Sequence, residues 1–178
     1  PSGRSDSTNA INMALRVPGQ ALLVEGVALI SSPITLRSHS SLVGVGSGPY
    51  NQRDTIRGSQ LRPVASFVGP AAVVLDPATE GTQAYINGVT LSNFCVDMTA
   101  VTQRKMIGIQ VLSAADPGVF QNLKVMNQDT GHYVYVGQSA NKGALPSEGV
   151  VFDNLLCLSL GIDPPNADAG VVVEASNE

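Results

Sequence analysis

Apolar and polar residues alternate with a helical period only near the start of the chain. Four apolar residues share one stripe there: Ala10, Ile11, Ala14 and Leu15. Side-chain oxygens in residues 6–8 can cap the exposed amides of a first helical turn, and Pro18-Gly19 ends the pattern. The pattern therefore predicts one short amphipathic helix near residues 6–15, suited to covering an open edge of a β structure.

After Gly19 the apolar positions form short runs that are separated by turn residues, which indicates strands. No second helix of any length is expected. The predicted strands are Ala21–Val24, Ala28–Ile30, Ile34–Leu36, Ser41–Val45, Ala71–Leu75, Tyr85–Val96, Ile107–Leu112, Val119–Met126, Tyr133–Val136, Val150–Leu158 and Val171–Val173.

A weak repeat in the second half decides the expected architecture. Asn93, Asn122 and Asn154 each begin a five-residue apolar segment, and they lie 29 and 32 residues apart. A second strand follows each segment after a variable loop. A period of this length without helices is typical of a stacked β-solenoid. Because asparagine tolerates the left-handed backbone region, we expect the three residues to stack at one corner between strands.

Composition limits the possible functions. The chain has 178 residues, 13% charged residues and a net charge of −4, with only 10 lysines and arginines. The low basic content argues against nucleic-acid binding, and no apolar run approaches the ~20 residues that span a bilayer. The low overall charge suggests that much of the surface is covered by stacking, by self-association or by both. Cys95 and Cys157 have no metal-ligand spacing, and we expect no cofactor and no metal.

The N-terminal third resembles a known family. Residues 5–15 (SDSTNAINMAL) resemble the capping-helix entry of pectate-lyase-like β-helices, which commonly reads Asp-Ser/Asp-Thr-x-Ala-Ile-x-x-Ala. Residues 25–36 (EGVALISSPITL) and 41–48 (SLVGVGSG) are similar to the strands that follow, and residues 55–57 fall where the next coil usually starts. Two features depart from the pattern: Pro18-Gly19-Gln20 replaces the usual three glycines, and Ala28 replaces an aromatic.

This resemblance implies an all-β fold, a single-stranded right-handed parallel β-helix with a short N-terminal capping α-helix. The expected domain is 1–178, with the capping helix at 5–17 and the coils at 20–178. It implies a bacteriophage tailspike or tail-fibre module, a homotrimer in the virion or outside the cell, in contact with other virion proteins and with bacterial surface polysaccharide. We expect either a fragment of a longer spike or a short module that other chains cap.

An enzymatic role needs paired carboxylates on neighbouring coils, one to protonate the leaving oxygen and one to activate water or attack the sugar. The candidates are Asp129, Glu148 and Asp153, whose loops can approach one another. The residues needed for a hydrolase or lyase are otherwise missing, which favours a non-enzymatic role for this chain. A polysaccharide-degrading enzyme and a capsid decoration or scaffold protein without a ligand stay open as alternatives.

Candidate glycan contacts are sparse, because tryptophan is absent and aromatic residues make up 4% of the chain. Tyr133 and Tyr135 alternate along one predicted strand and should share a face. If that face points outward, the two rings can stack on a sugar; packing in the core or against another subunit is the other interpretation.

Overall fold

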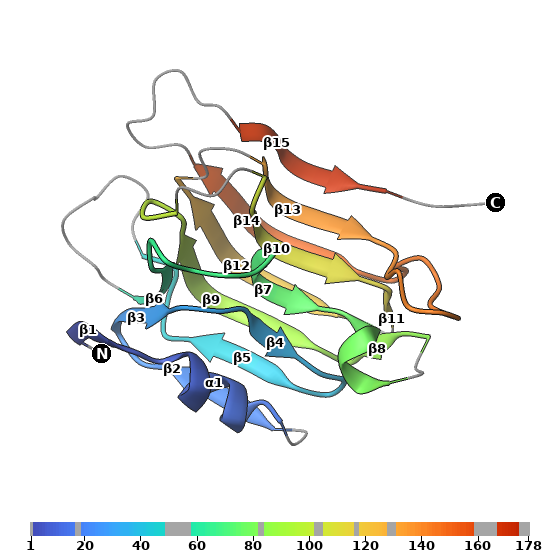
Figure 1. Cartoon of the computed structure of the whole chain (residues 1–178), viewed down its shortest axis with the longest axis horizontal. Coiled ribbons are helices and arrows are strands. Elements are labelled where there is room, and N and C mark those ends of the chain that lie inside the picture. The colour runs from blue at the N-terminus through green and yellow to red at the C-terminus, as the bar shows by residue number, and fades with distance from the viewer. Residues whose placement is uncertain are drawn as a thin grey trace.

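The computed structural model describes residues 2–16, 19–48, 58–81, 84–101, 105–115, 118–127, 131–158 and 167–174. Most of these residues lie in short strands, and every strand pair is parallel. The chain contains mainly β structure with parallel sheets, as the alternating pattern predicts (Figure 1).

The first and larger sheet has the strand order β1-β3-β6-β9-β12-β14, with β2 and β5 attached beside β9. Its strands are β1 (Ser2–Asp6), β2 (Gln20–Leu23), β3 (Gly26–Ile30), β5 (Ser41–Gly44), β6 (Ser59–Pro63), β9 (Thr90–Asp97), β12 (Val119–Met126) and β14 (Val151–Leu158).

The second sheet has the order β15-β13-β10-β7-β4, and a two-strand ladder joins β11 to β8. These strands are β4 (Ile34–Leu36), β7 (Ala71–Leu75), β8 (Ile86–Asn87), β10 (Ile107–Leu112), β11 (Ala114–Ala115), β13 (Gly131–Gly137) and β15 (Ala167–Val173). From β6 onward the chain visits the first sheet and then the second in each turn, so residues about 30 positions apart become neighbours.

The three repeat asparagines bend the long strands. Asn93, Asn122 and Asn154 have φ values of 61°, 52° and 56°, in the left-handed region. The Nδ2 of Asn122 donates to the Oδ1 of Asn93, and the Nδ2 of Asn154 donates to the Oδ1 of Asn122, both at 2.9 Å. The predicted asparagine stack is therefore confirmed. At Asn93 the bend lets the first half of β9 pair with β5 and the second half pair with β6.

Inward side chains form one continuous core between the sheets. Along the first sheet the register stacks Leu42, Leu91, Phe120 and Phe152. Along the second it stacks Ile34, Val73, Ile109 and Val134, all fully buried. This layering explains why short apolar runs suffice for strands: each run is buried by the runs before and after it.

The predicted helix is α1 (Thr8–Ala14), which lies against β2 and β4 at one end of the stack (Figure 1). Ile11 and Leu15 point into the core. The expected bounds of 5–17 are too wide at the start, because Asp6 belongs to β1, where it pairs with Leu29 of β3. The carboxylate of Asp6 then accepts a hydrogen bond from the amide of Thr8.

Four short elements were not foreseen: β1, β6, β11 and the 3-10 helix η1 (Pro77–Glu80). The strand predicted at 85–96 is instead two strands, since Gly88 has a φ of 59° and breaks it between β8 and β9. No helix in the described part of the chain is long and apolar enough to cross a membrane.

Candidate functional site

The structure describes two of the three predicted carboxylates, and each of the two has its own hydrogen-bond partner. Asp129 lies outside the described residues. Glu148 is exposed between β13 and β14, where its amide donates to the carbonyl of Ala114. Desolvation and a hydrogen bond from the Tyr85 hydroxyl to Glu148 raise the pKa of Tyr85. Asp153 is exposed on β14 and instead accepts a 3.0 Å hydrogen bond from Nε2 of Gln121.

The two candidate tyrosines have different surroundings. Tyr133 is 5% exposed and belongs to the core, next to the equally buried Val134. Tyr135 is partly exposed, its hydroxyl donates to Glu174 at 2.6 Å, and its ring stacks on His132 at 6.2 Å between centroids. Two consecutive buried residues interrupt the strict alternation, so Tyr135 is the only one of the pair with an accessible ring.

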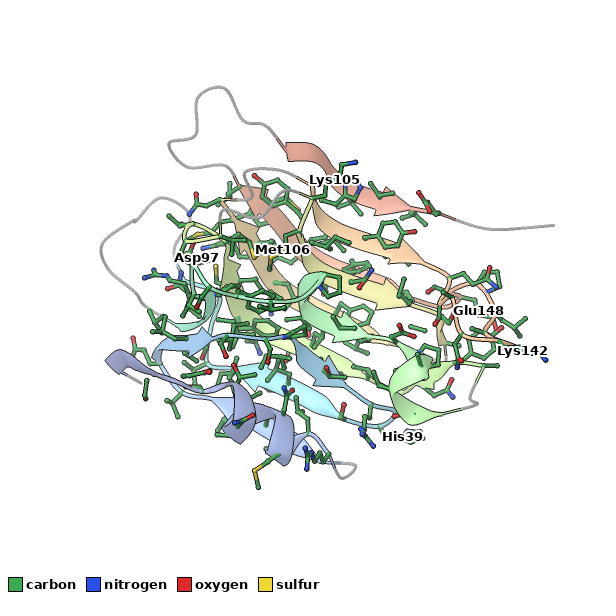
Figure 2. All side chains as sticks on the ribbon, in the orientation of Figure 1. His39, Asp97, Lys105, Met106, Lys142 and Glu148 are labelled. Atoms are coloured by element: carbon green, nitrogen blue, oxygen red, sulfur yellow. The ribbon has the colours of Figure 1, made fainter. Side chains whose placement is uncertain are left out.

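Sequence reasoning missed a buried polar network around Asp97, at the opposite end of the strands from Glu148 (Figure 2). Oδ2 of Asp97 accepts from Nε2 of Gln60 at 2.8 Å and forms an ion pair with Arg62 at 2.9 Å. Oδ1 accepts from the amide and hydroxyl of Thr99 and from Asn127. Because both oxygens are saturated, this carboxylate joins β6, β9 and the end of β12 and is not placed to transfer protons.

The surroundings of the two cysteines and of the buried Lys124 fit a structural role. Burial, followed by the charge of Asp97, raises the pKa of the Cys95 thiol to about 12, and burial raises that of Cys157 to about 11. Both thiols stay protonated at neutral pH and are poor nucleophiles. Burial lowers the pKa of Lys124, whose Nζ donates to the carbonyl of Gly48 at 2.9 Å. Within the described residues, no three His, Cys, Asp or Glu side chains gather to hold a metal.

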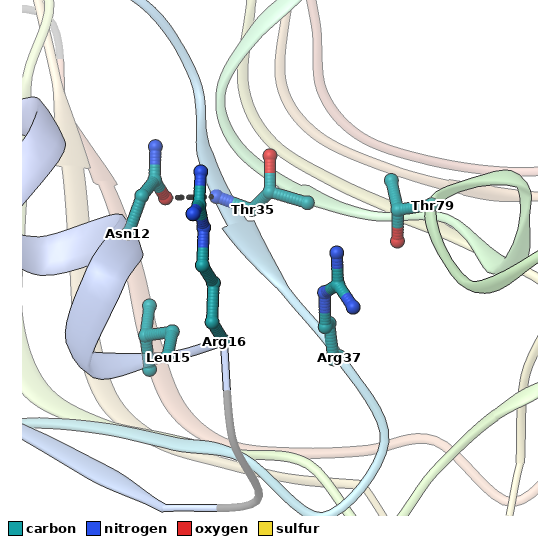
Figure 3. Close-up of a pocket in the computed structure, with 6 residues that line it drawn as sticks. All are labelled: Asn12, Leu15, Arg16, Thr35, Arg37 and Thr79. Atoms are coloured by element: carbon teal, nitrogen blue, oxygen red, sulfur yellow. Dashed lines mark hydrogen bonds between the residues drawn. The ribbon is translucent and has the colours of Figure 1, made fainter.

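A polar pocket of about 280 Å³ lies between α1, β4 and η1. Its lining residues come from three segments: Asn12, Leu15, Arg16, Thr35, Arg37 and Thr79. Figure 3 shows the guanidinium groups of Arg16 and Arg37 on either side of Thr35. This pocket gathers two basic side chains, and no pattern in the sequence indicated it.

The frame of this pocket is well ordered by hydrogen bonds. The side chain of Asn12 donates to the carbonyl of Pro33 and accepts from the amide of Thr35, both at 2.9 Å (Figure 3). It thereby pairs the edge of β4 as a further strand would. The hydroxyl of Thr79 donates to the carbonyl of Asp76 at 2.7 Å. The walls are therefore fixed, while the two arginine side chains are exposed.

Comparison of the chain with protein-family models, with curated proteins and with solved structures finds no match.

Proposed function

We propose that this chain is a right-handed parallel β-helix of the pectate-lyase-like type. In this proposal it serves as a bacteriophage tailspike or tail-fibre module in the virion and contacts bacterial surface polysaccharide. The observation that carries the proposal is the stacking of successive strands in two parallel sheets, with an asparagine ladder at the bend. The N-terminal motif that resembles this family coincides with α1 and the first coils.

A homotrimer is part of this proposal. Exposed apolar side chains cluster around β2 and β5, where Leu22 is 62%, Val24 52% and Val45 58% exposed. Apolar patches on soluble proteins mark contact surfaces with other molecules. Sedimentation of the purified chain at micromolar concentration should give three times 18.4 kDa. A monomer at that concentration would contradict the trimer.

The glycan contact is tested with capsular polysaccharide and lipopolysaccharide immobilised from a panel of bacterial strains. We expect saturable binding to the polysaccharide of at least one strain, without shortening of the polymer. Lack of binding to every polysaccharide would favour a scaffold role. Shortening that Asp153→Asn abolishes would instead identify a depolymerase, and Glu25→Gln serves as a control at an exposed carboxylate away from β14.

A further inference from the structure

The pocket between α1, β4 and η1 concentrates positive charge on an acidic chain. Arg16 follows the end of α1 and Arg37 follows β4, and both guanidinium groups line the same cavity. Among the described residues neither forms an ion pair, whereas Arg62 is paired with Asp97. The nearby carboxylate of Glu80 is engaged by the amide and hydroxyl of Ser38, at 2.5 and 2.8 Å. Two unpaired guanidinium groups beside one cavity produce a local positive potential in a chain of net charge −4.

The lining selects the kind of ligand. Guanidinium presents donors in a planar fork that matches the two oxygens of a carboxylate or phosphate. The hydroxyl of Thr35 has no hydrogen-bond partner among the described residues and faces the same cavity. None of the six lining residues is aromatic, so a neutral sugar has no ring to stack on. The lining therefore favours a small anionic group with neighbouring hydroxyls over a neutral sugar.

The size of the pocket limits how much of a ligand enters. Its volume of about 280 Å³ is close to the lower end of the ~300 to ~1,000 Å³ common for small-molecule sites. One sugar ring with its charged substituent suits this space. A long polyanion such as a nucleic acid is disfavoured, because the rest of the chain carries excess negative charge.

We propose that the Arg16–Arg37 pocket binds a sugar that carries a carboxylate or phosphate group. This inference rests on the proposed contact with surface polysaccharide and specifies its chemistry as acidic. The guanidinium groups hold the anionic oxygens, and Thr35 and Thr79 contact ring hydroxyls. The rigid frame built by Asn12 and Asp76 means that few groups other than the arginine side chains lose freedom on binding.

The probes are glucuronate, glucose 6-phosphate, glucose, inorganic phosphate and tetraglutamate, each titrated into the full chain. Binding is followed through the Nε–H NMR signals of the arginines. We expect saturable shifts of the Arg16 and Arg37 signals with glucuronate or glucose 6-phosphate, and none with glucose. The comparison of these two acidic sugars separates a carboxylate ligand from a phosphate ligand.

Two variants separate the pocket from general charge. Arg16→Gln with Arg37→Gln should weaken binding of the acidic sugar at least about tenfold, since two charge-assisted contacts are lost. Lys142→Gln removes one positive charge from an exposed turn and should change the affinity for the acidic sugar less than about twofold. Thermal unfolding of both variants at the native temperature would show that the loss does not arise from unfolding.

Several results would overturn the inference: no saturable binding of either acidic sugar, equal binding of glucose, equal binding of inorganic phosphate alone, tighter binding of tetraglutamate, or an equal effect of Lys142→Gln. Different results would contradict the proposed function and the pocket inference. If the double variant binds surface polysaccharide as well as the native chain does, the pocket inference is wrong and the polysaccharide contact stands. If glucuronate binds but no polysaccharide does, the pocket stands and the proposed function is wrong.

Discussion

Inward-facing side chains are covered to different extents at the two ends of the strand stack. At the N-terminal end α1 covers the core with Ile11 and Leu15, and Asn12 pairs the free edge of β4. At the other end β14 and β15 are the last strands of their sheets among the described residues. Phe152 is partly exposed there, and Val173 is 69% exposed.

The register makes this difference informative, because each inward residue of β14 has a counterpart in β12. Phe120 is 1% and Leu123 is 1% exposed, whereas their partners Phe152 and Leu155 are only partly buried. The side chains are alike, so burial depends on whether a coil has neighbours on both sides. Stability in such a stack is a sum of interfaces between neighbouring strands, and among the described residues β14 has one such interface in place of two.

The largest expected effect comes from the paired phenylalanines, whose rings lie 5.0 Å apart. Phe120→Ala leaves a cavity in a fully packed layer and should lower the free energy of unfolding by about 3–5 kcal/mol. Phe152→Ala removes a partly buried ring and should cost about 1–2 kcal/mol. Urea denaturation at low protein concentration measures both. Equal losses would mean that another molecule covers β14 in solution.

A smaller effect is expected along the asparagine ladder. Asn122 both donates to Asn93 and accepts from Asn154, whereas Asn154 makes only the one ladder bond. Glycine allows the same positive φ, so Asn122→Gly and Asn154→Gly remove the side-chain bonds without backbone strain. We expect losses of about 2 and about 1 kcal/mol, measured by thermal unfolding. A larger loss at Asn154 would contradict the idea that the outer coil is the weaker one.

The smallest expected effect on stability is at the end that α1 covers, and it depends on pH. Hydrogen bonds from Ser31, and then from Thr8, lower the pKa of Asp6 below 3.8 in the folded chain. The ionised carboxylate therefore contributes stability that is fully present above pH 3.8 and is lost as the pH falls through the lower folded pKa. Asp6→Asn should cost about 0.5–1 kcal/mol at pH 7.

The measurement is the difference in unfolding midpoint between native chain and Asp6→Asn, followed from pH 7 to pH 2. That difference should stay constant down to about pH 4 and then shrink. A difference that is the same at pH 2 and pH 7 would show that the carboxylate charge does not hold α1 to β3.

Local patterns in the sequence predicted features with local causes. The positions of Asn93, Asn122 and Asn154 could be found because a left-handed bend favours one residue type and recurs once per coil. The helix could be found from its stripe and from the oxygens before Thr8. The strand β6 was missed, since Ser59–Pro63 is mostly polar and becomes buried only through its pairing with β3 and β9.

The polar sites could not be predicted in this way. Arg62 contacts Asp97 across 35 positions, and Arg16 lines the same pocket as Arg37 although β2, β3 and β4 lie between them in the sequence. The contact between such residues depends on the register of neighbouring coils, which irregular loop lengths conceal. The candidate carboxylates show the same limit, because Glu148 lies three residues before the start of β14 and Asp153 two residues after it, yet their partners differ.

The sequence by itself determined that the chain would form short stacked strands, bend at three asparagines and begin with one amphipathic helix. Those features follow from backbone preference and from the period of apolar residues. Only the tertiary structure decided which polar side chains meet, which end of the core is covered and where two arginines line one pocket. The physical reason is that parallel stacking turns a separation of about 30 residues into direct contact.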